Sequence, residues 1–299
     1  MLRKGLAVAV ILLFIGMSVV PSTAVTELKD VSTVSFDGNT IYVDDDNTEG
    51  PWDGTEEYPF NKIEDGIDAA NDGDTVFVFN GEYKEGYFKL EKPIKVIGED
   101  RENTIINANG YSTVFTIWVS NCQISGFTIR NSTSSFTDWQ IKVYRSNTII
   151  SNNIIENGGP TAIRILYSSG CYIFNNIIRN NGGDGIIITD YISNDNARYN
   201  LIFGNHIEGN YRGLLFWGSR TCRNLVIRNN FIDNRKVDST FNDAARNFWI
   251  NNYWNQPGIK PVKIYGIVYI LLDWGPYGYP KPFNVTRFDW FPASEPYDI

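Results

Sequence analysis

Residues 173–178 read Ile-Phe-Asn-Asn-Ile-Ile, and this pattern of apolar residues around a turn residue occurs six times between residues 121 and 254. The turn residue at its fourth position recurs at intervals of 22 to 29 residues. A period in this range is typical of a solenoid, in which each unit buries its apolar side only against its neighbours. The six copies begin at Ile124, Ile150, Ile173, Ile202, Ile227 and Trp249.

The composition of the repeat favours strands over helices. It lacks both the apolar period of roughly 3.6 residues and the long runs that mark helical repeats. Its Ile, Val, Phe and Tyr residues stand in short runs separated by Asn and Gly, which is typical of strands and turns. The sequence therefore predicts an all-β fold, a single-stranded right-handed parallel β-helix.

The fourth position of the repeat is Asn in five of the six copies. Asn tolerates a left-handed turn, and its amide can donate to the equivalent Asn of the next coil, about 4.8 Å away at strand spacing. We therefore predict a structural asparagine ladder. Its predicted members are Asn153, Asn176, Asn205, Asn230 and Asn252.

With these repeats the chain resembles the parallel β-helix repeat proteins, including the secreted pectate-lyase-like (pectin-lyase-like) group and the NosD-like periplasmic family. The resemblance covers most of the chain after residue 24 and implies the fold. Residues 200–204 also resemble a signature of the pectin-methylesterase-like β-helices. Asn200 stands where that family has its nucleophilic Asp, and an amide cannot attack an ester as a carboxylate does, so we exclude that esterase activity.

The N-terminus predicts export. Arg3 and Lys4 precede an apolar core, Leu6–Val20, and small residues precede Val25, so Met1–Ala24 is expected to be a cleaved signal peptide. The apolar core is shorter than the ~20 residues that span a bilayer, although an uncleaved tether is the alternative. We expect a secreted or cell-surface protein with no membrane span after cleavage. The expected segments are a signal peptide (1–24), a leader with an acidic turn (25–58), a capping helix with the first coils (59–112), β-helix repeats (113–256) and an aromatic, proline-rich C-terminal cap (257–299).

One convincing helix is expected over Pro59–Asn71. Phe60, Ile63 and Ile67 fall on one face of it. A single amphipathic helix before a solenoid can cover the open apolar end of the first coil. The aromatic tail is expected to cover the last coil in the same way.

Charge and metal-ligating residues exclude several classes of function. The chain has 26 basic and 34 acidic residues, which argues against nucleic acid as a partner. The three cysteines are expected to be packing residues, because Cys122 and Cys171 lie two coils apart and His206 is the only histidine. We predict no metal site, with calcium as an alternative at Asp44, Asp45 and Asp46.

The candidate site lies on the outer face of the first strand of each coil. Paired inward residues, such as Ile141 with Val143, place Lys142 outside, and the outer surface changes from cationic to apolar along the solenoid. The Thr189–Arg198 loop, the longest after a first strand, is expected to form a wall of the site. The candidate ligand-binding residues are Tyr144, Tyr167, Tyr191, Asp195 and Arg198.

Three functions follow from these features. The first is an exported, non-catalytic protein that binds polysaccharide or cell-surface glycan, or contributes to a surface layer. The second is a polysaccharide lyase or glycoside hydrolase acting on uronate-containing polysaccharide, with Lys142, Arg164 and Asp190 as catalytic residues. The third, a NosD-like accessory role at a copper site, is implied by the resemblance alone, because both methionines, Met1 and Met17, lie in the signal peptide.

Overall fold

The computed structural model describes residues 38–133, 139–159, 161–190, 196–244, 246–255, 262–270, 281–289 and 292–299. The chain divides into two units, Met1–Ser35 and Phe36–Ile299, and every described residue belongs to the second. The predicted signal peptide lies outside the described residues. Within them, no helix has the length and apolar character needed to cross a membrane.

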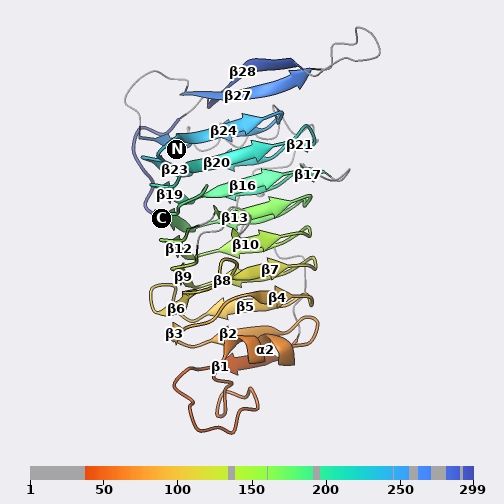
Figure 1. Cartoon of the computed structure of the whole chain (residues 1–299), viewed down its shortest axis with the longest axis vertical. Coiled ribbons are helices and arrows are strands. Elements are labelled where there is room, and N and C mark those ends of the chain that lie inside the picture. Colours follow the sequence, from red (N-terminus) through yellow and green to blue (C-terminus); the bar gives the residue numbers. More distant parts are fainter. Residues whose placement is uncertain are drawn as a thin grey trace, which may run out of the picture. The chain divides into compact units, whose positions relative to one another are not determined.

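The second unit is an all-β parallel β-helix, as the repeat predicts (Figure 1). In its described residues, each of seven complete coils contributes one strand to each of three parallel sheets, which we name sheets 1, 2 and 3 in chain order. Sheet 1 contains β4 (Phe88–Leu90), β7 (Phe115–Ile117), β10 (Trp139–Val143), β13 (Thr161–Leu166), β16 (Ile186–Thr189), β20 (Arg212–Trp217), β24 (Val237–Asn242) and β27 (Val262–Ile270).

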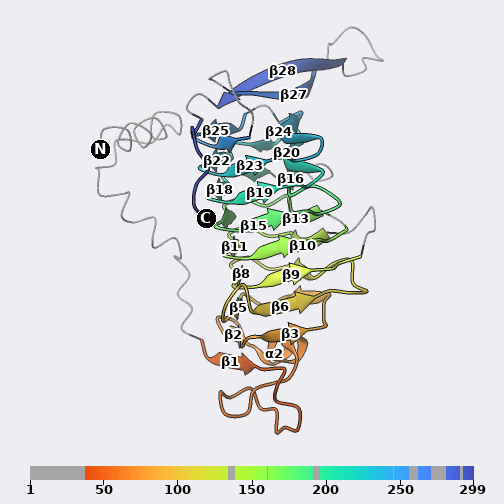
Figure 2. The same ribbon diagram turned by 90° about the vertical axis from the view of Figure 1, so that its left-hand side faces the viewer.

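Sheets 2 and 3 form the other two sides of each coil (Figure 2). Sheet 2 contains β1 (Thr40–Val43), β2 (Thr75–Val78), β5 (Lys95–Gly98), β8 (Gln123–Ser125), β11 (Ile149–Ser151), β14 (Tyr172–Phe174), β18 (Leu201–Phe203), β22 (Leu225–Ile227) and β25 (Phe248–Ile250). Sheet 3 contains β3 (Gly81–Tyr83), β6 (Thr104–Asn107), β9 (Thr128–Arg130), β12 (Ile154–Glu156), β15 (Ile177–Arg179), β19 (His206–Glu208), β23 (Asn230–Ile232) and β26 (Tyr253–Trp254). The remaining elements are α2 (Ile63–Ala69), β17 (Ala197–Arg198), β21 (Thr221–Cys222) and β28 (Lys281–Asp289).

The apolar core lies between the three sheets. Strand alternation turns every second side chain inward, and the predicted inward residues of sheet 1, such as Ile141 and Val143, are fully buried. Each inward residue also lies beside its equivalent in the next coil, as Ile141 lies beside both Phe115 and Ile163. The core is therefore a set of aliphatic and aromatic columns along the solenoid.

Helix α2 is shorter than the predicted Pro59–Asn71 and begins at Ile63. The backbone of Phe60 cannot enter the helix, because its N–H donates to Tyr42 and its carbonyl accepts from Asp44 beside β1. The helix contacts β1, β2 and β4 and buries Ile63 and Ile67 against the first coil. It therefore occupies the position predicted for a cap.

Two charged side chains from the first coil fix the ends of α2. Glu85 accepts hydrogen bonds from the backbone N–H groups of Ile63 and Glu64 at its N-terminus. Lys92 donates to the carbonyls of Asp68 and Ala70 at its C-terminus. Each charge has the sign that stabilises the helix dipole at that end, so the cap is held to the coil at both ends.

The predicted asparagine ladder runs along the corner between sheets 2 and 3. In Asn176, the backbone N–H and the side-chain amide both donate to Oδ1 of Asn205, at 3.0 Å each. The same amide donates to the carbonyl of Ile150 in the preceding coil. The preceding residue, Asn175, adopts the left-handed conformation with φ 55°. We call this the first ladder; its asparagines are Asn153, Asn176, Asn205, Asn229 and Asn252.

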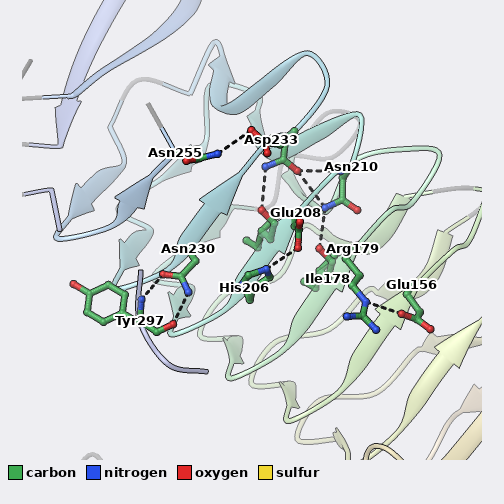
Figure 3. Close-up of polar contacts among 12 residues, drawn as sticks. Glu156, Ile178, Arg179, His206, Glu208, Asn210, Asn230, Asp233, Asn255 and Tyr297 are labelled. Carbon is green, nitrogen blue, oxygen red and sulfur yellow. Dashed lines mark hydrogen bonds and ion pairs between the residues drawn. The ribbon is translucent and has the colours of Figure 1, made fainter. Parts of the chain in front are cut away.

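The prediction of Asn230 as a ladder member is wrong by one residue. The run Leu225-Val226-Ile227 is apolar throughout, so the sequence does not show whether Val226 or Ile227 is inward, and the structure places Val226 beside Ile202. Asn229 therefore takes the ladder position and accepts from Asn205. Asn230 begins β23, and its side chain makes reciprocal hydrogen bonds with the backbone of Tyr297 (Figure 3).

Two further ladders were not predicted. The second, between sheets 3 and 1, links Asn181, Asn210 and Asn234 through the same side-chain bonds. The third, between sheets 1 and 2, links Asn200, Asn224 and Asn247. Asn200, excluded above as a nucleophile, therefore has a structural role. In the two coils that contain β18 and β22, each corner carries a hydrogen-bonded asparagine, and all of these except Asn234 are buried.

The C-terminal segment closes the last coil. Strand β27 continues sheet 1 beside β24 and pairs antiparallel with β28. Asp289, at the end of β28, is buried and accepts hydrogen bonds from the backbone and side-chain amides of Asn252 and from the Trp254 indole. Its carboxylate takes the place of the next ladder asparagine. The second ladder ends likewise, on Asp238.

A matched pair of substitutions tests this register. Asn229→Ala removes the acceptor of two amides of Asn205, whereas Asn230→Ala removes only the bonds to Tyr297. Because buried amides without partners are costly, we expect Asn229→Ala to lower the free energy of unfolding by about 2–4 kcal/mol and Asn230→Ala by about 1 kcal/mol. Urea denaturation measures both. An equal or larger loss in Asn230→Ala would contradict the assignment.

The buried carboxyl groups predict a pH dependence of stability. Burial raises the pKa of Asp289 above its ordinary value despite the hydrogen bonds that it accepts. The folded chain then binds more protons than the unfolded one between the two pKa values, so its stability rises as the pH falls through the raised pKa. Burial raises the pKa of further carboxyl groups in the same direction: Asp45, Glu85, Asp190 and Asp238.

We therefore expect the free energy of unfolding to increase as the pH is lowered from 7 to 5. Asp289→Asn should make this increase smaller, because an amide does not titrate. It should also lower the free energy of unfolding at both pH values by about 1–3 kcal/mol, because the new NH₂ group faces the N–H donors of Asn252 and Trp254. Denaturant titrations at several pH values measure both effects. A wild-type chain that loses stability between pH 7 and pH 5 would refute the expectation.

Candidate functional site

A column of outward side chains runs along sheet 1. Two of its three cationic members, Lys142 and Arg164, lie directly opposite one another on β10 and β13. Like charges in this position repel one another and destabilise the fold, so other contacts of the pair must compensate for this repulsion. The column is Lys89, Thr116, Lys142, Arg164, Ile187 and Leu215, which is the predicted order from cationic to apolar.

Trp139 offsets part of that cost. The Lys142 ammonium lies 4.4 Å from the centre of the Trp139 ring and 4.8 Å from that of Tyr144. The Arg164 guanidinium carbon lies 4.2 Å from the same Trp139 ring. Cation–π attraction to one ring therefore holds both charges. Trp139 was missed in the sequence because the first strand was placed only from its inward pair, Ile141 and Val143.

The Arg164 guanidinium is half-buried, and its Nε atom has no hydrogen-bond partner. Burial lowers its pKa, while the Tyr167 and Tyr144 hydroxyls and Asp184 act in the opposite direction. Asp184 is itself held by two hydrogen bonds from Arg212, both 2.7 Å. Within the described residues, neither Lys142 nor Arg164 forms an ion pair. Arg164 is thus a partly desolvated cation whose Nε atom is unpaired and covered from solvent.

Exposed aromatic rings extend the site along the solenoid. Trp118 stacks on Tyr144 with ring centres 4.1 Å apart and planes 4° from parallel, and 43% of Trp118 is exposed. One coil before, Lys89 lies 5.0 Å from the Tyr87 ring, which is 57% exposed. We call this surface the basic–aromatic face; it comprises Tyr87, Lys89, Trp118, Trp139, Lys142, Tyr144 and Arg164.

The other predicted site residues do not all join this face. Asp190 is buried, and its carboxylate accepts a hydrogen bond from the backbone of Arg220 in the next coil. Burial raises its pKa, and among the described residues no ion pair or hydrogen bond joins it to Lys142 or Arg164. Arg198 lies at the corner towards sheet 2, in β17. Tyr191 and Asp195 lie outside the described residues.

The outer face of sheet 3 carries charges of both signs. Arg130, Glu156, Arg179 and Glu208 follow one another on adjacent strands with alternating sign. Figure 3 shows the Arg179 and Glu156 side chains pointing toward one another, with Nε and Oε2 2.7 Å apart, and His206 with Glu208 at 2.9 Å. This face neutralises its own charges, whereas the basic–aromatic face does not.

The residues that could bind a metal do not converge. Cys122 and Cys171 are buried free thiols, and His206 pairs with Glu208 alone. Asp44 accepts from the backbone of Asp46 within its own turn, and Asp45 accepts from Glu82. Across the described ranges, no group of three His, Cys, Asp or Glu side chains is placed to hold a metal ion. The donors therefore fit neither copper nor calcium.

Thiol reactivity tests the state of the cysteines. Burial raises the pKa of Cys122 to about 11 and that of Cys171 to about 12, which disfavours the reactive thiolate. Only Cys222 is half-exposed. We expect the folded chain to react with a thiol reagent at one site, the Cys222→Ser variant at none, and the unfolded chain at three. Rapid labelling of two thiols in the folded Cys222→Ser variant would contradict this.

Solved structures align with this chain at low identity. XylC in complex with xylose aligns at 11% identity and a TM-score of 0.50, covering 71% of this chain and 62% of that one. An alginate lyase from Paenibacillus sp. aligns at 16% identity and a TM-score of 0.43, covering 73% and 88%. The A-module of a mannuronan C-5 epimerase from Azotobacter vinelandii aligns at 14% identity and a TM-score of 0.35, covering 70% and 78%.

The sequence itself identifies the family. No curated protein sequence shows a significant match. The family profile described as "Periplasmic copper-binding protein (NosD)" matches residues 63–275, which are well over half of the chain and include every complete coil. The protein therefore belongs to the NosD family of parallel β-helix proteins.

Proposed function

We propose that this protein is exported from the cytoplasm and binds an acidic polysaccharide on its basic–aromatic face. The observation that carries the proposal is the Lys142–Arg164 pair. These two cations oppose one another across neighbouring strands and have no carboxylate partner among the described residues. A bound anionic group would relieve their repulsion.

The aromatic side chains favour a sugar polymer over a small anion. Trp118 and Tyr87 expose flat rings beside the cations, and such rings suit the apolar faces of sugars while charged groups fix their orientation. The cationic column runs across parallel strands spaced about 4.8 Å apart. An extended polyuronate, with carboxylates repeated along its length, matches this arrangement.

Binding is better supported than cleavage. A lyase or hydrolase needs a base or a pair of carboxylates beside the reacting sugar, and Asp190 is instead bound to the backbone of Arg220. The copper-binding description of the family is not extended to this chain, because two of its three thiols are buried and its histidine pairs with a glutamate.

The test uses the mature chain, residues 25–299, against oligomers of uronic acids and of neutral sugars. We expect binding to the uronates, with the Kd raised at least ~10-fold in Lys142→Ala/Arg164→Ala, since charged hydrogen bonds contribute about 1.5–3 kcal/mol. Arg179→Ala on sheet 3 is the matched control and should bind like the wild type. Calorimetry measures the Kd values.

Two results would refute the proposal. One is uronate binding that the double substitution leaves unchanged, and the other is the absence of binding to every acidic glycan tested. Release of unsaturated or reducing ends from the same polymers would instead establish the enzymatic alternative.

A further inference from the structure

Exposed arginines gather at the corner between sheets 1 and 2. The net charge of the chain is −8, so this cluster is not a consequence of a basic composition. We call it the arginine ridge; it comprises Arg145, Arg198, Arg223 and Arg246, with Tyr199 among them, and all five are exposed.

Backbone contacts place Arg198, Arg223 and Arg246 in three consecutive coils, and Arg145 lies two coils before Arg198. The carbonyl of Arg198 accepts from Gly170 in the preceding coil, and β17 pairs with β21, where Arg198 lies opposite Cys222. Arg223 follows Cys222 directly and donates its backbone N–H to Arg246. The ridge therefore follows the axis of the solenoid, at about 4.8 Å a coil.

Tyr199 lies between two guanidinium groups. The Arg198 and Arg223 guanidinium carbons lie 5.5 Å and 5.8 Å from the centre of its ring, and Arg223 donates to its hydroxyl. The ring is nevertheless 47% exposed. Within the described residues neither arginine forms an ion pair, so both can accept an anionic partner.

The backbone of the ridge is unusual for its residue types. Tyr199 and Arg223 both adopt the left-handed conformation with φ 57°. The equivalent corners of earlier coils use Asn121, Asn147 and Gly170, which tolerate it at lower cost. Bulky exposed residues in this conformation point to a functional role, because strain of this kind gathers at binding sites.

The ridge is continuous with the basic–aromatic face. Tyr144 of that face directly precedes Arg145 of the ridge, and Arg145 donates to the Tyr144 carbonyl. From β10 to β20 the solenoid advances three coils, or about 14 Å. A single extended polymer can therefore contact both surfaces.

We infer that the arginine ridge is a second contact region for the acidic polysaccharide, one that makes affinity depend on polymer length. This inference rests on the proposed function of the face. A short oligomer occupies the face alone, whereas a longer chain continues across Arg145 to Arg198 and Arg223. The second contact is then intramolecular, which raises the affinity without a second binding event from solution.

The test compares a uronate trimer with a long polymer of the same uronate. The ridge variant is Arg198→Gln/Arg223→Asn, since Asn suits the left-handed conformation of residue 223. We expect its Kd for the polymer to rise about tenfold or more and its Kd for the trimer to stay unchanged. Its affinity for the polymer should also depend less on salt. An unchanged melting temperature shows that the variant is folded.

Failure of the inference can be told from failure of the proposed function. If the ridge variant binds polymer and trimer as the wild type does, the ridge is not a contact region, while the face remains. If the ridge variant binds the trimer as much more weakly as it binds the polymer, affinity does not depend on polymer length through the ridge and the inference is wrong. If the wild type binds neither ligand, both proposals are wrong.

Discussion

The hydrogen bond between one asparagine side chain and the next is the interaction on which the rest of this structure depends. In the first ladder, Oδ1 of Asn205 takes two donors from Asn176, and its amide donates to Ile173 and Asn229. A coil displaced by one residue would lose these buried bonds together and turn its apolar side chains outward. In the coils of β18 and β22 ladders occupy all three corners, so the strands of these coils are held against such a slip at both ends.

Fixed register determines which charges meet on the surface. Lys142 and Arg164 are 22 residues apart in the sequence, yet they must lie side by side because Ile141 and Ile163 are in register beneath them. Sheet 3 resolves the same constraint by alternating arginine with glutamate, as Arg179 does with Glu156. Sheet 1 does not, and the repulsion that it retains is the physical reason to regard it as a binding surface.

The fold could be predicted because the same inward position is occupied by an apolar residue in several copies of the repeat. The two additional ladders were also within reach, since Asn200 and Asn210 stand five residues before and after Asn205, and the same offsets recur around Asn229. The phase at Asn230 was ambiguous because Val226 and Ile227 are both apolar. The environment of Asp190 was not predictable, because its partner is the backbone of Arg220, thirty residues later, in a turn whose shape the sequence does not fix.

The ladders also explain how the corners can carry unusual residues. A left-handed tyrosine or arginine would weaken an isolated turn, but Tyr199 and Arg223 are each followed by a ladder asparagine, Asn200 or Asn224, that is held by the coils on both sides. The turn is determined by the ladder and not by the residue that occupies it. The side chains of Tyr199 and Arg223 are therefore not needed to form the turn and are available for binding.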